Sequence, residues 1–307
     1  MSYRSGDAYL AMKQALSLNP QPIVPFQEKA AFYAWNAGEN EAAEALFKKL
    51  PADVFTPSIR LGYAHSLVAQ RKGAEAEAQL APVLEAIPAS TKILDADAAA
   101  LKLQPLKLRF VALGLMSQAF GIDNGKKVKA LEERLALFPK IMDNAKNLHF
   151  QAETLSDQKV KETQDLAILY LQQGQRDKAI AALNRSIDEG EAHGKEFGYL
   201  NNTIVSLLKN AWMLSVNIPS SIDKGHALVQ KLDKEFNEQK AFTPLVTQKW
   251  AELKLIQAAF LDKNFDKASA ELWKSKAIES LKVDKPEIFQ NLGRYRFEIA
   301  KDQLAGG

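Results

Sequence analysis

The clearest pattern of apolar and polar positions lies between Asp165 and Ile187. Apolar residues recur at helical spacing from Leu166 to Leu171, and a second apolar stripe runs from Ala179 to Ile187. Gly174 separates the two stripes, and a glycine can close a helix at little cost because it tolerates a positive φ. The pattern predicts two short helices packed against each other. A pair this short needs neighbours on both sides to bury its apolar stripes.

The same spacing recurs elsewhere: a turn residue, a small residue five positions later, and a large residue four positions after that. The small residue lets two helices approach closely, and the large one fills the space one turn later. This recurrence predicts helix pairs stacked along the chain. The sets are Gly38, Ala43 and Phe47; Gly73, Ala78 and Pro82; Gly174, Ala179 and Leu183; Lys263, Ala268 and Leu272; and a weaker candidate at Gly125, Ala130 and Arg134.

The segments around these sets give the predicted organisation. A first amphipathic helix is expected over residues 6–18, and a last helix over residues 286–304 is expected to cap the array. The polar stretch 188–198 predicts a flexible loop. Pro82 predicts a kinked or late-starting helix, because proline inside a helix costs about 3 kcal/mol. The expected divisions are N-terminal repeats at 1–140, a polar connection (a solvated helix or a mobile segment) at 141–164, and C-terminal repeats with the capping helix at 165–307.

These residues resemble the tetratricopeptide repeat family, in which each repeat is a helix pair with small and aromatic residues at fixed offsets. The resemblance implies an all-α, TPR-like superhelix: a right-handed solenoid of about six to eight antiparallel helix pairs. The matching residues are Tyr170, Gly174, Ala179 and Leu183 in the best copy, Gly38, Ala43 and Phe47 in the first, and Gly62, Gly73 and Ala78 in the second.

In that family the first helix of each pair lines a concave groove, which implies a place for a partner. Aromatic, amide and charged side chains at these positions suit an extended peptide or a partner helix. Packing between repeats is the alternative interpretation of each aromatic residue. The set of Asn and Lys residues with which some members grip a C-terminal carboxylate is missing. The expected partner-binding residues are Phe32, Trp35, Asn36, Arg60, Tyr63, Gln70, Gln164, Gln172, Trp250 and Gln257.

Composition and motifs argue against several other functions. The 40 basic and 37 acidic residues give a net charge of +3, which is too balanced to favour nucleic acid. The chain has no cysteine, so disulfides and thiolate metal sites are excluded. None of the four histidines stands at ligand spacing from another. His65 is interpreted as structural and His193 as a solvated loop residue. We therefore expect no metal, no cofactor and no catalytic residues.

The sequence thus predicts a non-catalytic scaffold or adaptor that binds a protein or peptide in its groove. A bacterial envelope or secretion assembly is the setting that we expect. The alternative is a regulatory or sensory module that binds a small ligand or a signalling peptide. The sequence shows no signal peptide and no apolar run long enough to span a membrane. A cytoplasmic or a periplasmic location both fit, and the oligomeric state stays open.

Overall fold

The computed structural model describes residues 2–18, 23–88, 105–145 and 149–197, together with residues 207 and 210. Every regular element within these residues is helical, so the predicted all-α class is confirmed for them. Contacts divide the chain into a first unit, Met1–Asn147, and a second unit, Leu148–Gly307. Each unit is described on its own. The predicted set at Lys263 and the predicted helix 286–304 lie outside the described residues.

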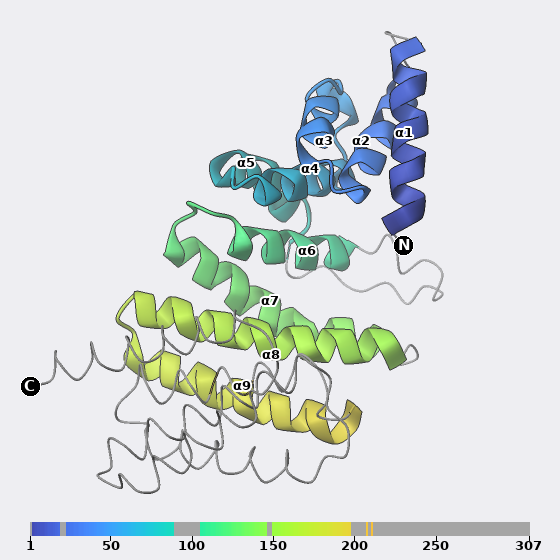
Figure 1. Cartoon of the computed structure of the whole chain (residues 1–307). Coiled ribbons are helices and arrows are strands. Elements are labelled where there is room, and N and C mark those ends of the chain that lie inside the picture. The colour runs from blue at the N-terminus through green and yellow to red at the C-terminus, as the bar shows by residue number, and fades with distance from the viewer. Residues whose placement is uncertain are drawn as a thin grey trace, which may run out of the picture. The chain divides into compact units, whose positions relative to one another are not determined.

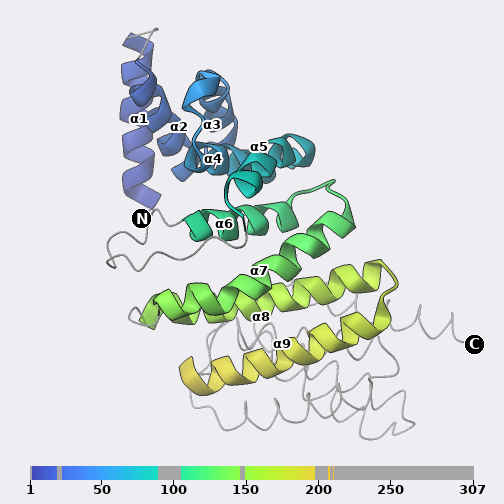
Figure 2. The same cartoon turned by 180° about the vertical axis from the view of Figure 1, so that it is seen from behind.

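In the first unit, helices pack mainly on their neighbours in sequence (Figure 1). α2 pairs with α3, α4 with α5, and α6 with α7, while α1 packs on α2. In addition α4 contacts both α2 and α6, so the first helices of the three pairs lie side by side (Figure 2). This succession of adjacent pairs is compatible with a helical solenoid. The bounds are α1 Ser2–Leu18, α2 Val24–Asn36, α3 Asn40–Phe47, the 3-10 turn η1 Ala52–Val54, α4 Pro57–Ala69, α5 Gly73–Ala86, α6 Pro105–Gln118 and α7 Asn124–Ala145.

The second unit contains the helix pair α8 (His149–Gln172) and α9 (Arg176–Phe197). The predicted flexible loop over residues 188–198 is wrong, because α9 continues through it to Phe197. Gly190 is buried there, and a Cβ at this position would lie 2.7 Å from Cδ2 of Leu207. The glycine therefore permits close packing instead of ending the helix. Most of the polar stretch 141–164 is likewise helical, as part of α8.

Three of the helix pairs are joined by the same tight turn. Each turn has three residues, and the middle one has a positive φ: 82° at Gly38, 60° at Arg71 and 72° at Gly174. The next residue donates its N–H to the carbonyl five positions earlier, a closure typical of helix C-termini. The three turns therefore have the same backbone conformation. The donor and acceptor pairs are Glu39 and Ala34, Lys72 and Leu67, and Gln175 and Tyr170, each at 2.9 Å.

The turn geometry corrects the second predicted set by two residues. Arg71, two positions before the predicted glycine, holds the left-handed conformation. Ala76 and Leu80 then occupy the small and large positions, and both are fully buried. Ala78 is exposed, and Pro82 lies late in α5, which begins at the expected end of the turn. The predicted late start of this helix is therefore wrong.

Two glycines of the first unit are needed for close approach of neighbouring helices. A Cβ on Gly73 would lie 1.7 Å from the carbonyl oxygen of Phe120, in the turn between α6 and α7. A Cβ on Gly62 would lie 2.8 Å from the ring of Phe32 and 3.1 Å from the ring of Phe47. Both contacts are shorter than a side chain allows, so the spacing between pairs depends on these positions.

The α6–α7 pair fills the large position with a buried arginine. Arg134 is 4% exposed, and its guanidinium carbon lies 3.7 Å from the centre of the Phe110 ring. The guanidinium also donates to the carbonyl oxygen of Phe110. Gly114 makes room for it, because a Cβ there would lie 2.3 Å from Nη1. The small position of this pair is Ala130, 4% exposed, as the sequence predicted.

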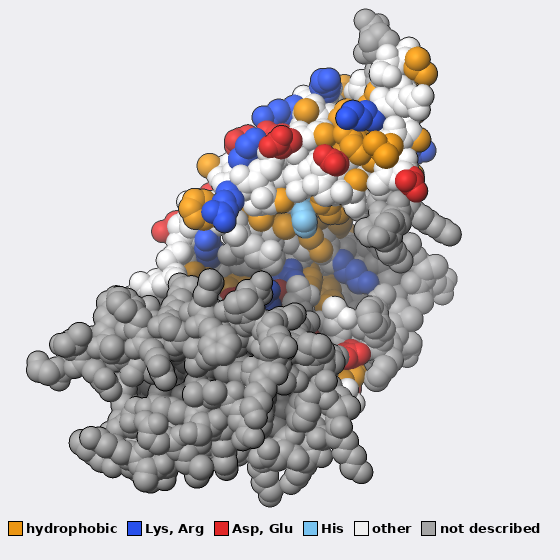
Figure 3. All heavy atoms as spheres, in the orientation of Figure 1, with side chains coloured by type: hydrophobic (Ala, Val, Ile, Leu, Met, Phe, Trp, Pro, Cys, Tyr) orange, Lys and Arg blue, Asp and Glu red, His pale blue; other side chains and the backbone are white. Residues whose placement is uncertain are grey.

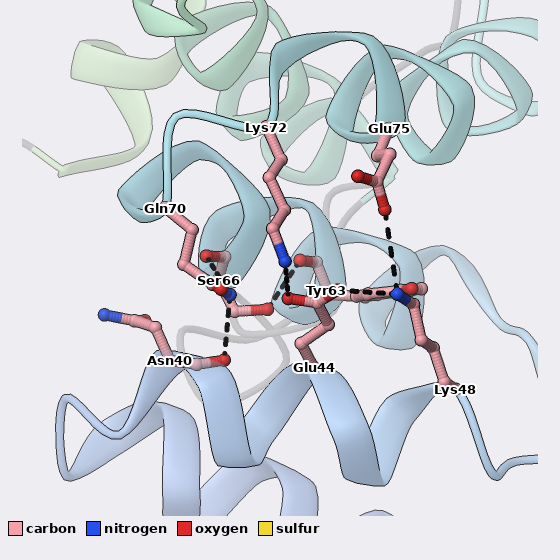
Figure 4. A network of polar contacts seen from close by, with 8 residues as sticks. All are labelled: Asn40, Glu44, Lys48, Tyr63, Ser66, Gln70, Lys72 and Glu75. Atoms are coloured by element: carbon pink, nitrogen blue, oxygen red, sulfur yellow. Dashed lines mark hydrogen bonds and ion pairs between the residues drawn. The ribbon is translucent and has the colours of Figure 1, made fainter.

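A buried carboxylate ties α3 to the turn between α4 and α5 (Figure 4). Glu44 accepts hydrogen bonds from Nζ of Lys48 and of Lys72, each at 2.6 Å. Burial acts to raise the pKa of Glu44, but hydrogen bonds from Lys48, Lys72 and Gln70 and the charge of Lys72 outweigh it. Together they lower the pKa of this carboxyl from 4.5 to about 2. The charged form is therefore part of the folded state.

Gly38→Ala should lower the free energy of unfolding by about 1 kcal/mol, because an L side chain is strained at positive φ. Space does not limit the substitution, since no atom lies within 4 Å of the Cβ position. Gly6 has equally open surroundings but lies inside α1 without a positive φ, so Gly6→Ala should be neutral or stabilising. Urea unfolding compares the two variants. Equal effects would contradict the role assigned to the turn.

Glu44→Gln should cost on the order of 2 to 3 kcal/mol at pH 7, because the two lysines lose their charged acceptor. The pKa of Glu44 is lowered in the folded chain, so its contribution is complete above about pH 5 and disappears as pH falls towards 2. The variant's loss of stability should therefore shrink on acidification. Glu41→Gln, at an exposed position in the first turn of the same helix, is the control and should cost less than about 1 kcal/mol at either pH. Thermal unfolding from pH 7 to pH 3 measures both.

Candidate functional site

The first helices of the three pairs leave one side uncovered by their partners. On each of α2, α4 and α6, one set of exposed or half-buried residues recurs three, four or seven positions apart, which places the set on one stripe. We name this surface the first-helix face. Figure 3 shows the side of the unit on which hydrophobic side chains gather among basic and acidic ones. The residues of the face are Glu28, Phe32, Trp35 and Asn36 on α2, Ser58, His65 and Ala69 on α4, and Lys107, Val111 and Gln118 on α6.

A tryptophan and a histidine join α2 to α4 at the surface. Nε1 of Trp35 donates a hydrogen bond of 2.9 Å to Nδ1 of His65. Their rings meet edge to face with centroids 5.2 Å apart, and the Phe32 ring lies 6.0 Å from the Trp35 ring. The hydrogen bond fixes the indole, so this aromatic surface has a defined orientation before any partner binds.

The hydrogen bond also determines the protonation of His65. Because Nδ1 accepts, the hydrogen of the neutral ring is on Nε2. Desolvation lowers the pKa of His65 below its usual 6.5, although a backbone hydrogen bond opposes this. At neutral pH the pair thus presents two uncharged aromatic rings and one N–H donor.

Phe32 connects the surface pair of Trp35 and His65 to the buried core. Its ring meets that of Phe47 edge to face at 5.5 Å, and Phe47 in turn stacks on Tyr63 at 5.6 Å. Phe47 is fully buried. Aromatic contacts of this kind contribute roughly 0.5 to 1.5 kcal/mol each beyond the area that they bury. The aromatic packing that joins the first two helix pairs therefore also holds Trp35 in place.

The expected partner-binding residues separate into two groups in the first unit. Phe32, Trp35 and Asn36 lie together on the first-helix face. Tyr63 is 6% exposed and belongs to the core. The other two make contacts within the unit: Nη1 of Arg60 donates to Gln79 on α5, and Nε2 of Gln70 donates to the carbonyl oxygens of Asn40 and Ser66.

The remaining expected residues lie elsewhere. In the second unit, Gln164 is 2% exposed and Gln172 is exposed at the end of α8. Trp250 and Gln257 lie outside the described residues. The structure therefore brings together only the expected residues of α2.

The interpretation of His65 as a structural histidine agrees with its hydrogen bond from Trp35, but the error of two residues in this pair left it out of the expected partner-binding residues. The local signal for the correct register is the start of α4. Thr56 and Pro57 are typical of a helix N-terminus, and Oγ1 of Thr56 accepts the N–H of Ile59 at 3.3 Å. Counting from that start places His65 on the exposed stripe and Tyr63 in the core.

The interpretation of His193 as a solvated residue is also wrong. His193 is 3% exposed on α9, with its ring 5.1 Å from that of Phe197. Burial lowers its pKa, while the charges of Asp157, Glu153 and Glu196 act in the opposite direction. Its Nδ1 has no hydrogen-bond partner within the described part of the chain. The residue is therefore a neutral core histidine.

Within the ranges that the structure covers, no three His, Asp or Glu side chains are grouped so that they could hold a metal ion. None of the described helices is both long and apolar enough to cross a membrane. No protein-family model matches the chain, and no curated protein sequence matches it. The first-helix face is therefore the feature of the described residues from which a function can be inferred.

The indole N–H of Trp35 should titrate with His65. At neutral pH Nδ1 is free to accept, and protonation at a pH below 6.5 removes the acceptor and breaks the bond. In ¹⁵N spectra the indole resonance missing from Trp35→Phe should shift as pH falls below 6.5. His65→Gln should abolish this titration. An indole resonance that is constant with pH would contradict the hydrogen bond.

Proposed function

We propose that the protein is a non-catalytic scaffold or adaptor that holds a protein or peptide partner on the first-helix face. The observation that carries the proposal is the pair of Trp35 and His65, which is oriented by a hydrogen bond and lies at the surface of a helix layer. Aromatic side chains fixed in this way supply much of the energy of protein interfaces, because they offer a large contact area and lose little entropy on binding.

The packing of the core next to Trp35 and His65 favours a binding role for this pair over a purely structural one. Phe47 and Leu67 in the core of the first two helix pairs are fully buried, whereas His65 is exposed. An exposed histidine adds little to stability at such a position. A partner that covered both rings would instead bury aromatic area.

We further propose that the helix pairs belong to a tetratricopeptide-like superhelix. The three turns of the same geometry support it, as do the contacts of α4 with α2 and with α6. So does the recurrence of a buried small residue and a buried large residue after each turn. In such an array the first-helix face is the inner surface, which is long enough for an extended segment of a partner.

Trp35→Ala should weaken partner binding about thirtyfold, because truncating a central aromatic residue of an interface typically costs about 2 kcal/mol. The measurement is quantitative mass spectrometry of proteins retained by the immobilised full chain. His65→Ala should weaken retention of the same partner. Phe120→Ala removes an aromatic ring that is 63% exposed outside the first-helix face, and should leave retention unchanged.

Circular dichroism shows whether each variant keeps its helices. If Trp35→Ala and Phe120→Ala retain the same proteins in equal amounts, the first-helix face is not the binding surface. A folded Phe120→Ala variant that alone loses the partner would place binding at the turn between α6 and α7.

A further inference from the structure

Lys107 gives the first-helix face a second, electrostatic feature. It is the third residue of α6 and is half-buried, with the exposed Val111 one helical turn later on the same stripe. α6 packs directly on α4, which carries His65. The first-helix face thus extends from Trp35 on α2, across α4, to the ammonium group of Lys107 and the neighbouring Val111 on α6.

Several other cations of the first unit are paired with carboxylates. Lys72 pairs with Glu44, Lys126 pairs with Glu77, and the buried guanidinium of Arg109 pairs with Glu133. Lys107 has no such pair with any residue that the structure describes. Desolvation also lowers its pKa below 10.5, so the charged form has lost water without gaining a counter-charge. A carboxylate placed beside it would restore the missing interaction.

We propose, on the basis of the function proposed above, that the partner is a protein segment whose Asp or Glu side chain binds Lys107 while an apolar residue packs on Trp35. Charge complementarity decides the occupant and its direction. Glu28 lies seven residues before Trp35 on the same stripe of α2 and repels a carboxylate there. The acidic end of the segment therefore lies on α6 and the apolar end on α2.

The helix layer also sets the spacing of the two contacts in the partner. From α2 to α6 there are two interhelical steps of about 8 to 10 Å each. Trp35 is near the end of α2 and Lys107 near the start of α6, so the contacts are at least roughly 20 Å apart. An extended chain covers about 3.3 Å per residue, so roughly six or more residues separate the acidic residue from the apolar one. A single ammonium group among apolar and aromatic residues suits such a peptide better than nucleic acid, which needs many basic contacts.

The test selects random dodecapeptides displayed on phage against the immobilised full chain and keeps those clones that lose binding to Trp35→Ala. These clones should be enriched in Asp or Glu about six or more residues from a large apolar residue. Amidated synthetic copies measured by fluorescence anisotropy should bind about tenfold more weakly to Lys107→Met, which keeps the side chain's length without its charge. Lys107→Arg should retain most of the affinity.

Lys49→Met is the matched control, because it removes one exposed lysine outside the first-helix face and should leave affinity unchanged. Replacing the acidic residue of a selected peptide by Asn or Gln should weaken binding to the unmodified chain but not to Lys107→Met. Clones that depend on Trp35 but have no acidic residue, or bind Lys107→Met equally well, would overturn this inference and leave the proposed function intact. If no clone depends on Trp35, the proposed function fails as well.

Discussion

The distance at which the two helices of a pair can pack is set by one small residue, five positions after the left-handed residue of each turn. Ala43, Ala76 and Ala179 are all fully buried at this position. A larger side chain would push the two helices of a pair apart, because a close-packed core has no space to absorb it. The left-handed residue of the turn serves the same constraint, since it reverses the chain within three residues. The rest of the structure depends on this repeated, close pairing.

The close pairing determines where binding can occur. Because α4 packs on its partner α5 and on both α2 and α6, its exposed residues, His65 and Ala69, lie on one stripe. Residues far apart in sequence thereby come together, as Trp35 and His65 do across two pairs. The Glu44 network adds a second, polar link between the same two pairs, on the second-helix side. The first-helix face therefore results from helix packing, and the Trp35–His65 contact and the Glu44 network both hold its first two helix pairs together.

Sequence reasoning succeeded where the glycine of the pattern is also the left-handed residue of the turn, as at Gly174. It failed in the second pair because two roles are separated there. Arg71 takes the left-handed position, with its guanidinium carbon 5.9 Å from the centre of the Phe120 ring, while Gly73 serves the close approach to the Phe120 carbonyl. A single sequence cannot distinguish a glycine needed for φ from one needed for space.

The same ambiguity explains the other errors. Gly190 was interpreted as a loop residue, yet it lies inside α9 against Leu207. Phe32 and Trp35 of α2 are half-buried and contact Phe47 and His65, so the packing alternative applies to both, and their binding of a partner stays a prediction. Lys107 had no signal of its own. Its position matters only because the fold removes water from it and provides no carboxylate among the described residues.

Hydroxyl-radical footprinting of the chain with and without a bound partner tests the central claim most directly. Trp35 and His65 have oxidisable rings at the surface, and Phe120 provides an exposed ring outside the first-helix face. The account predicts that the partner protects Trp35 and His65 from oxidation and leaves Phe120 as reactive as before. Protection of Phe120 with unchanged oxidation of Trp35 and His65 would contradict it.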